Sequence, residues 1–303
     1  MATQTDAEGL SLRFVTSLLV ENEVRLDPNQ FEQALGSRLQ RALETFSDDN
    51  LPKIAQASAS ILHEISQPDY DRAKVLSIFR QDPALAGKVV KTANSAAYAK
   101  SRVPLSSLDH ALSMLGADGL RRLLLTTLVA ENFDIKPIYF KLFGAALWNH
   151  SYQVAVATEY LLRGDKEQQF VGYVCGLIHD IGKLVVFRQM LTLFAELPPD
   201  HTPAPEGLAR LVDQYGFRLT LRACEYWELP ASWIAPMVEL RQHRQGQPLS
   251  ALAQALSEAN HAAEIFRLEQ LQLLDAAELD SYLAACGLTP SRYQELKQCF
   301  ETR

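Results

Sequence analysis

The chain has 303 residues, of which 48% are hydrophobic and 21% are charged, a balance that excludes global disorder and is typical of a folded globular protein. Its formal net charge is −7, so the surface as a whole repels phosphate backbones and we expect no nucleic-acid partner. The four cysteines are widely spaced without a Cys-x-x-Cys pair, which predicts free thiols in a reducing compartment.

The first residues lack the positive start and the apolar run of a secretory signal. The longest uncharged apolar run, residues 123–130, is far shorter than the roughly 18 residues that a membrane-spanning helix needs. We therefore expect a cytoplasmic protein that does not engage a membrane.

Apolar residues recur at helical spacing along nearly the whole chain. Residues 9–21 and 29–46 are predicted to form two helices of an N-terminal arm, 1–50, which ends in the polar turn 47–52. The next helices are predicted over 54–65 and 73–79, where apolar side chains recur every three or four residues.

Helix boundaries are indicated by capping residues and glycines. Asp82 and Pro83 predict a helix start, with the acid as N-cap and proline at the first helical position. A further helix is predicted from Ser107 or Asp109 to Gly116, and another from Asp118 onwards. Residues 135–137 then mark a joint that closes a helical half over 51–135.

The second half, 137–270, contains a Pro-rich loop at 197–207, and a tail of further helices follows over 271–303. In that tail, Asp275 and Glu278 form a predicted capping box, and Thr289-Pro290 predicts another helix start. Strand-like alternation and Asn-Gly hairpin signals are absent from the sequence. The predicted fold class is all-α.

The segment 175–187 carries the strongest chemical signal. His179 and Asp180 are adjacent, and Lys183 follows one turn later. An imidazole beside a carboxylate suits a divalent metal ion. His150 lies 29 residues before His179, which is enough chain for two antiparallel helices to bring the two rings together. Lys183 is expected to pair with an acid or a carbonyl, or in an active enzyme to meet a substrate phosphate.

His150 with His179-Asp180 resembles the HD superfamily of metal-dependent phosphohydrolases. The wider pattern resembles the HD-related output domain, or HDOD, family, and implies a multi-helix HD-like domain over 51–270. The motifs that carry this resemblance, in chain order, are Leu51-Pro52, Asp82-Pro83-Ala84-Leu85, Asn94-Ser95-Ala96, Ala111-Leu112 with Leu115-Gly116, and Trp227-Glu228-Leu229-Pro230.

The resemblance also implies that the metal site is degenerate. A hydrolase of this superfamily needs a later Asp as fourth ligand, and here the residue in that region is Asn260, whose neutral amide binds metal more weakly than a carboxylate. Arg218 and Arg241 stand where many relatives carry further ligands and are expected to bring positive charge towards the site. His243 and His261 are nearby in sequence, but neither fits the register of a replacement ligand.

Two interpretations of the remaining residues stay open. His150, His179 and Asp180 are either a buried polar cluster that holds two helices in register, with the rings hydrogen-bonded to each other, to Asp180 and to backbone, or the ligands of one adventitious divalent metal. No cofactor is expected to be required. Asn94 and Ser95 are either a polar break at a helix end or part of a groove that recognises a partner.

The predicted function is a non-catalytic signal-transduction output or scaffold module that acts through contacts with signalling proteins in trans. The resemblance places such modules in bacterial two-component and cyclic-dinucleotide networks. The arm 1–50 is the expected element for docking or homo-oligomer formation, and burial of the apolar face of helix 9–21 would weaken that expectation.

Two other functions remain open. One is a phosphohydrolase acting on a nucleotide or cyclic dinucleotide, with His150, His179 and Asp180 as metal ligands and Lys183 on phosphate. The Gly-Tyr-Pro motif of the cyclic-di-GMP-cleaving branch is absent after the His-Asp pair. The other is a sensor that binds a nucleotide without turnover.

Overall fold

The computed structural model describes residues 7–18, 28–44, 61, 63–65, 67, 69–81, 83–95, 108–130, 133, 141–196, 205–243 and 248–301. Within these ranges the regular elements are helices and no strand occurs, which confirms the predicted all-α class. The helices are α1 (Ala7–Ser17), α2 (Pro28–Glu44), α4 (Arg72–Gln81), α5 (Pro83–Ala93), α6 (Leu108–Ala130), α7 (Lys141–Leu161), α8 (Lys166–Ile178), α9 (Ile181–Glu196), α10 (Pro205–Tyr226), α11 (Ala231–Gln242), α12 (Ala251–Gln270), α13 (Ala276–Ala285) and α14 (Pro290–Glu301).

Several predicted boundaries coincide with the observed ones. α5 begins at Pro83, and α13 begins after a capping box in which Asp275 and Glu278 bond each other's backbone N–H groups. α14 begins at Pro290, preceded by Thr289 as predicted. Gly116 interrupts α6 with φ 70° and ψ −176°, so the predicted break is a sharp kink in a conformation that glycine adopts without strain. The predictions for 47–60, 135–137 and 197–204 fall outside the described residues.

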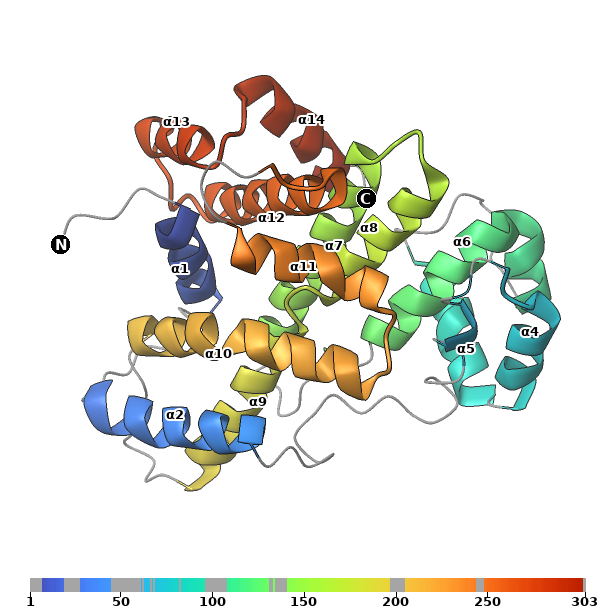
Figure 1. Ribbon diagram of the computed structural model, residues 1–303, viewed down its shortest axis with the longest axis horizontal. Coiled ribbons are helices and arrows are strands. Elements are labelled where there is room, and N and C mark those ends of the chain that lie inside the picture. The colour runs from blue at the N-terminus through green and yellow to red at the C-terminus, as the bar shows by residue number, and fades with distance from the viewer. Residues whose placement is uncertain are drawn as a thin grey trace.

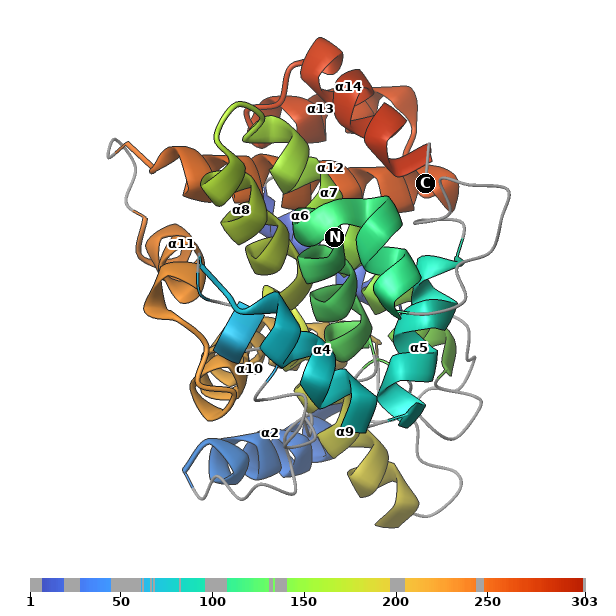
Figure 2. The same ribbon diagram turned by 90° about the vertical axis from the view of Figure 1, so that its right-hand side faces the viewer.

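Helix α6 joins the first helical half to the second, and Figure 1 shows it beside α4 and α5 at one end of the molecule. Arg121 on α6 is buried, donates to the Ile65 carbonyl and lies with its guanidinium 3.5 Å from the centre of the Phe170 ring on α8. A buried hydroxyl pair, Thr126 with Tyr173 at 2.7 Å, makes a second link between α6 and α8. These contacts fix the first half against the helices that carry the candidate site, and Figure 2 shows α6 next to α8.

Helices α7 and α8 form the centre of the second half, and glycine lets them approach closely. A Cβ atom at Gly176 on α8 would lie 2.4 Å from the Cα of Ala155 on α7, closer than real atoms come. The residues around this contact, including Val154 and Ala155, are completely buried. The tight packing sets the separation between His150 on α7 and His179 at the end of α8.

The stretch Lys166–Thr192, which covers α8 and most of α9, is long and apolar enough to cross a membrane by composition alone. Its most apolar window is 83% buried inside the protein, as expected for core helices of a folded domain. The apolar side chains of this stretch thus form part of the hydrophobic core.

The N-terminal helices do not form a free arm. α1 packs against α12 and α10, α2 packs against α10 and α9, and Figure 1 shows α1 in blue between α10 and α12. Leu10 and Phe14 on α1 have no exposed surface. α13 contacts α1, and α14 packs on α12 and α7. Since the apolar face of α1 is buried, α1 as it stands here offers little surface for docking another protein.

Candidate metal centre between α7, the α8–α9 corner and α12

His179 and Asp180 occupy the corner where the chain passes from α8 into α9. Thr220 on α10 holds this corner: its hydroxyl accepts a 3.0 Å bond from the Gly182 N–H and donates a 3.1 Å bond to the His179 carbonyl. A Cβ atom at Gly182 would lie 1.9 Å from the Gly216 carbonyl oxygen, so only glycine allows α9 and α10 to meet here. The backbone of the corner is therefore held in place by Thr220 and by the close packing of α9 on α10, independently of the His179 and Asp180 side chains.

Four side chains from three elements converge at the corner. The Oδ1 atom of Asn260 on α12 lies 3.1 Å from His150 Nε2 and 3.0 Å from His179 Nε2. The Oδ2 atom of Asp180 lies 3.3 Å from each of the same two nitrogens. The predicted direct bond between the two histidine rings is not formed; the ring centroids are 5.3 Å apart and the rings meet through the shared oxygens.

The protonation of the two histidines differs. Burial lowers the pKa of His150 to about 4, so this ring is neutral, and its Nδ1 atom has no hydrogen-bond partner among the described residues. Burial also acts to lower the pKa of His179, but the neighbouring Asp180 carboxylate raises it above its ordinary value. His179 Nδ1 donates to the Gly176 carbonyl at 2.8 Å, which leaves Nε2 facing Asn260 and Asp180.

Lys183 adds a positive charge to the cluster. Its Nζ atom lies 2.6 Å from Asp180 Oδ2, so the lysine pairs with an acid. Burial by itself would raise the pKa of the Asp180 carboxyl, but His179 and Lys183 hold it well below its ordinary value. The carboxylate is therefore ionised and already neutralised by a cation of the protein.

The donor set fits a divalent metal ion. Ligand atoms about 2.0–2.2 Å from such an ion lie roughly 3.0–3.5 Å apart, and the four distances between nitrogen and oxygen here are 3.0–3.3 Å. Because His179 Nδ1 carries a proton, a neutral His179 would have a lone pair on Nε2, facing the acceptor oxygens Asn260 Oδ1 and Asp180 Oδ2. Either a proton on Nε2 or a metal cation must therefore lie between these atoms. His150, His179 and Asp180 would hold the ion, and Asn260 would supply a fourth, weaker ligand.

Helix α1 covers this cluster. The Phe14 ring lies on His150 with centroids 4.3 Å apart, and Lys183 Nζ is 5.2 Å from the centre of the same ring. Ser11 donates to both carboxylate oxygens of Glu264 on α12, at 2.8 and 3.0 Å. Burial raises the pKa of the Glu264 carboxyl to about 7.

The positively charged residues expected near the site lie elsewhere. Arg218 is exposed on α10, and Arg241 is exposed at the end of α11 with its guanidinium 6.0 Å from the Phe217 ring. The expectation that they bring charge to the cluster is wrong, because their helices turn them to solvent and Lys183 supplies the charge instead. His243 is exposed, and His261 does not belong to the one group of three or more clustered His, Cys, Asp or Glu side chains found among the described residues.

Asn94 and Ser95 lie just after α5 and are exposed. The Asn94 amide donates to the Val90 carbonyl at 2.9 Å, and the Ser95 hydroxyl donates to the Thr92 carbonyl at 2.6 Å. Both side chains thus satisfy carbonyl groups at the end of their own helix.

Sequence reasoning missed Phe14, Ser11 and Glu264. Glu264 follows Asn260 by four residues on α12, so helical spacing places the two on one face and could have indicated it. Neither Phe14 nor Ser11 carries a local signal of this kind, because their partners in the cluster lie more than 100 residues away in sequence.

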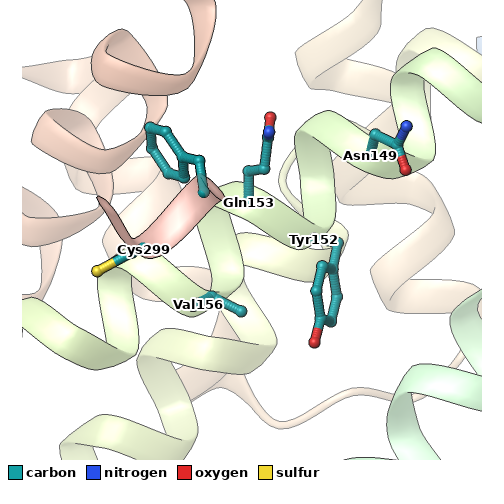
Figure 3. Close-up of a pocket in the computed structure, with 6 residues that line it drawn as sticks. Asn149, Tyr152, Gln153, Val156 and Cys299 are labelled. Atoms are coloured by element: carbon teal, nitrogen blue, oxygen red, sulfur yellow. The ribbon is translucent and has the colours of Figure 1, made fainter. Parts of the chain in front are cut away.

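A separate pocket lies on another side of α7, against α14 (Figure 3). Asn149 belongs to this pocket and is exposed, whereas the next residue, His150, is buried in the cluster. In Figure 3 the labelled side chains of Asn149, Tyr152 and Gln153 point in different directions and do not converge on one point. The residues that line the pocket are Asn149, Tyr152, Gln153, Val156, Cys299 and Phe300.

The helical fold and this arrangement of two histidines and an aspartate define a protein of the HD superfamily. Residues 51–244 match the HDOD domain family, and because this is more than half of the chain, the chain belongs to that family.

Solved structures share the fold at low sequence identity. A candidate phosphohydrolase from Shewanella amazonensis SB2B has a TM-score of 0.58 and 20% identity, over 87% of this chain and 96% of that one. An HDOD domain protein of unknown function from Geobacter sulfurreducens has a TM-score of 0.56 and 22% identity, over 88% of this chain and 94% of that one.

A sequence relative is an uncharacterized protein of Treponema pallidum (strain Nichols), which is 24% identical over 191 residues. The match covers 60% of this chain but only 36% of that relative's length.

Proposed function

We propose that this chain is a non-catalytic signalling module of the HD superfamily that acts through contacts with other proteins. The observation that carries the proposal is the closure of the cluster: Phe14 covers His150, and Lys183 neutralises Asp180 at 2.6 Å. In a hydrolase the metal needs an open coordination position for water or substrate. Here the side chains of His150, Asp180 and His179 are only 2%, 9% and 11% exposed.

The neutral fourth ligand also favours this proposal. Among one carboxylate, one amide and two imidazoles, only the carboxylate is negatively charged, and the Lys183 ammonium already neutralises that charge. A divalent ion in such a site is held weakly, and a catalytic pair of ions would need further ligands. We expect at most one adventitious divalent ion and no required cofactor.

The test is an activity assay on the full chain purified without chelator. We would measure metal content and then turnover of bis(p-nitrophenyl) phosphate and cyclic di-GMP with excess Mn²⁺. The expected result is no turnover above that of Asp180→Ala. Turnover that disappears in both His179→Ala and Asp180→Ala would contradict the proposal.

A second candidate function is metal-dependent phosphohydrolysis, favoured by the four donor distances of 3.0–3.3 Å. When bound, a divalent ion would lower the pKa of a coordinated water and polarise a phosphoryl oxygen. Of this chain's residues, His179 would present its Nε2 to such an ion because its Nδ1 is bonded to the Gly176 carbonyl, and Lys183 would have to leave Asp180 to meet phosphate. The same assay separates the two functions.

A further inference from the structure

Helix α1 reaches the cluster with contacts of three kinds. Its apolar residues pack against α10 and α12, and Phe14 lies on His150. Its hydroxyl, Ser11, bonds the buried Glu264. Its cation, Arg13, donates to Glu278 on α13 at 2.9 Å and lies 5.8 Å from the centre of the Tyr282 ring.

Two of these contacts depend on where the Lys183 ammonium lies. In the structure it is bonded to Asp180 Oδ2 and packs over the face of Phe14. A divalent ion on Asp180 Oδ2 would take the same oxygen and repel the ammonium. The lysine would then have to move, and among the described residues Glu264 is a second buried carboxyl group with which it interacts electrostatically.

A lysine that moves to Glu264 competes with Ser11 for the carboxylate and leaves the face of Phe14. Both changes remove contacts that hold α1. We propose that α1 is a removable lid whose docking is antagonistic to metal occupancy: a divalent ion at His150, His179, Asp180 and Asn260 weakens the docking of α1, and release of α1 strengthens ion binding. This goes beyond the proposed function, because the antagonism holds whether or not the chain turns over a substrate.

Thermodynamic linkage makes the proposal quantitative, because two linked equilibria must change each other by the same factor. The test uses the full chain, Mn²⁺ as the probe, and two readouts. Free Mn²⁺ is measured by electron paramagnetic resonance to give the dissociation constant. Amide hydrogen exchange across residues 10–17 measures the docking of α1 with and without Mn²⁺.

Arg13→Glu removes the polar anchor of α1 without touching the cluster, and Leu10→Asp places a charge at a fully buried position of α1 as a second way to undock it. Arg163→Glu makes the same charge change at an exposed residue after α7 and is the matched control. We expect both α1 variants to lose protection in α1 and to bind Mn²⁺ about tenfold more tightly, within the roughly 5- to 150-fold range of such couplings. In the wild type, Mn²⁺ should reduce the protection of α1 by the same factor.

Undocked α1 with an unchanged Mn²⁺ dissociation constant would overturn the proposal, and so would the absence of Mn²⁺ binding to either undocked variant. Protection of α1 that persists in both variants would overturn it as well, since the anchors would then not hold the helix. None of these outcomes depends on turnover, so the failure of this proposal and the failure of the proposed function are distinguishable.

Discussion

Lys183 Nζ lies 2.6 Å from Asp180 Oδ2, and this same oxygen lies 3.3 Å from the Nε2 atoms of both His150 and His179. One carboxylate oxygen thus interacts with three nitrogens. The protein supplies its own cation where a metal ion would bind, so the properties of the cluster depend on the competition between the two.

Replacing Lys183 tests this competition. Lys183→Met keeps the length of the side chain and removes its charge, while Asp180 retains His179. We expect a loss of about 1.5–3 kcal/mol in the free energy of unfolding, the usual range for a hydrogen bond to a charged group, together with tighter Mn²⁺ binding. Urea denaturation at pH 7.5 and Mn²⁺ titration measure the two effects. Lys166→Met, at the exposed start of α8, is the control and should change neither.

Asn260→Asp restores a carboxylate to the fourth ligand position. Without metal, the new charge lies beside the ionised Asp180 and should lower the melting temperature. With Mn²⁺, the added charge should strengthen binding about tenfold or more, because the number of charged ligands tunes affinity at such sites. Thermal denaturation with and without Mn²⁺ should show a larger metal-induced increase than in the wild type. An equal increase in both proteins would mean that residue 260 does not face the ion.

Glu264 predicts a pH-dependent stability. The carboxyl has a pKa of about 7 in the folded chain against an ordinary 4.5, so the folded chain holds this proton more tightly. Its contribution to stability is complete below about pH 4.5 and is lost as the pH rises towards 7.

Glu264→Gln keeps the shape and cannot ionise, so the variant should gain stability relative to wild type between pH 5 and pH 8. One pKa unit corresponds to about 1.4 kcal/mol, which predicts a relative gain of about 2–3 kcal/mol. Urea denaturation at the two pH values measures it. A difference between the proteins that is constant with pH would show that Glu264 titrates normally.

Gly182→Ala tests the backbone contact that fixes the corner. The added methyl would lie 1.9 Å from the Gly216 carbonyl oxygen, so α9 and α10 must separate. We expect a loss of at least about 1–3 kcal/mol, as for other overpacked cores, and weaker Mn²⁺ binding. Gly87→Ala on α5 is the matched control: a Cβ there meets nothing within 4 Å, and helix propensity predicts a small gain in stability.

Local sequence predicted the parts of the site that depend on helix geometry. His179, Asp180 and Lys183 fall within one turn at a helix corner, and His150 follows from the length of the intervening chain. Asn260 was placed by the resemblance to HD hydrolases, whose fourth ligand would fall on the helix that is α12 here. The helix starts at Pro83, Asp275 and Pro290 followed from capping chemistry.

Contacts between distant segments could not be predicted in the same way. The rotation of α10 and α11 decides that Arg218 and Arg241 face solvent, and this rotation is set by packing against several other helices. The same holds for α1, whose amphipathic pattern equally fits a free docking helix and a buried one. Whether α1 is free or buried depends on the helices that surround it in the folded chain.

The bonds of Arg13 to Glu278 and to the Leu273 carbonyl join segments more than 250 residues apart. During synthesis, α1 emerges before the segment from Leu273 to α13, so its polar anchor cannot form until that segment has also emerged. Domains generally fold as they emerge, from the N-terminus onwards. The cover that α1 forms over the HD cluster therefore gains its polar anchor only after α12 and the segment that follows it have been made.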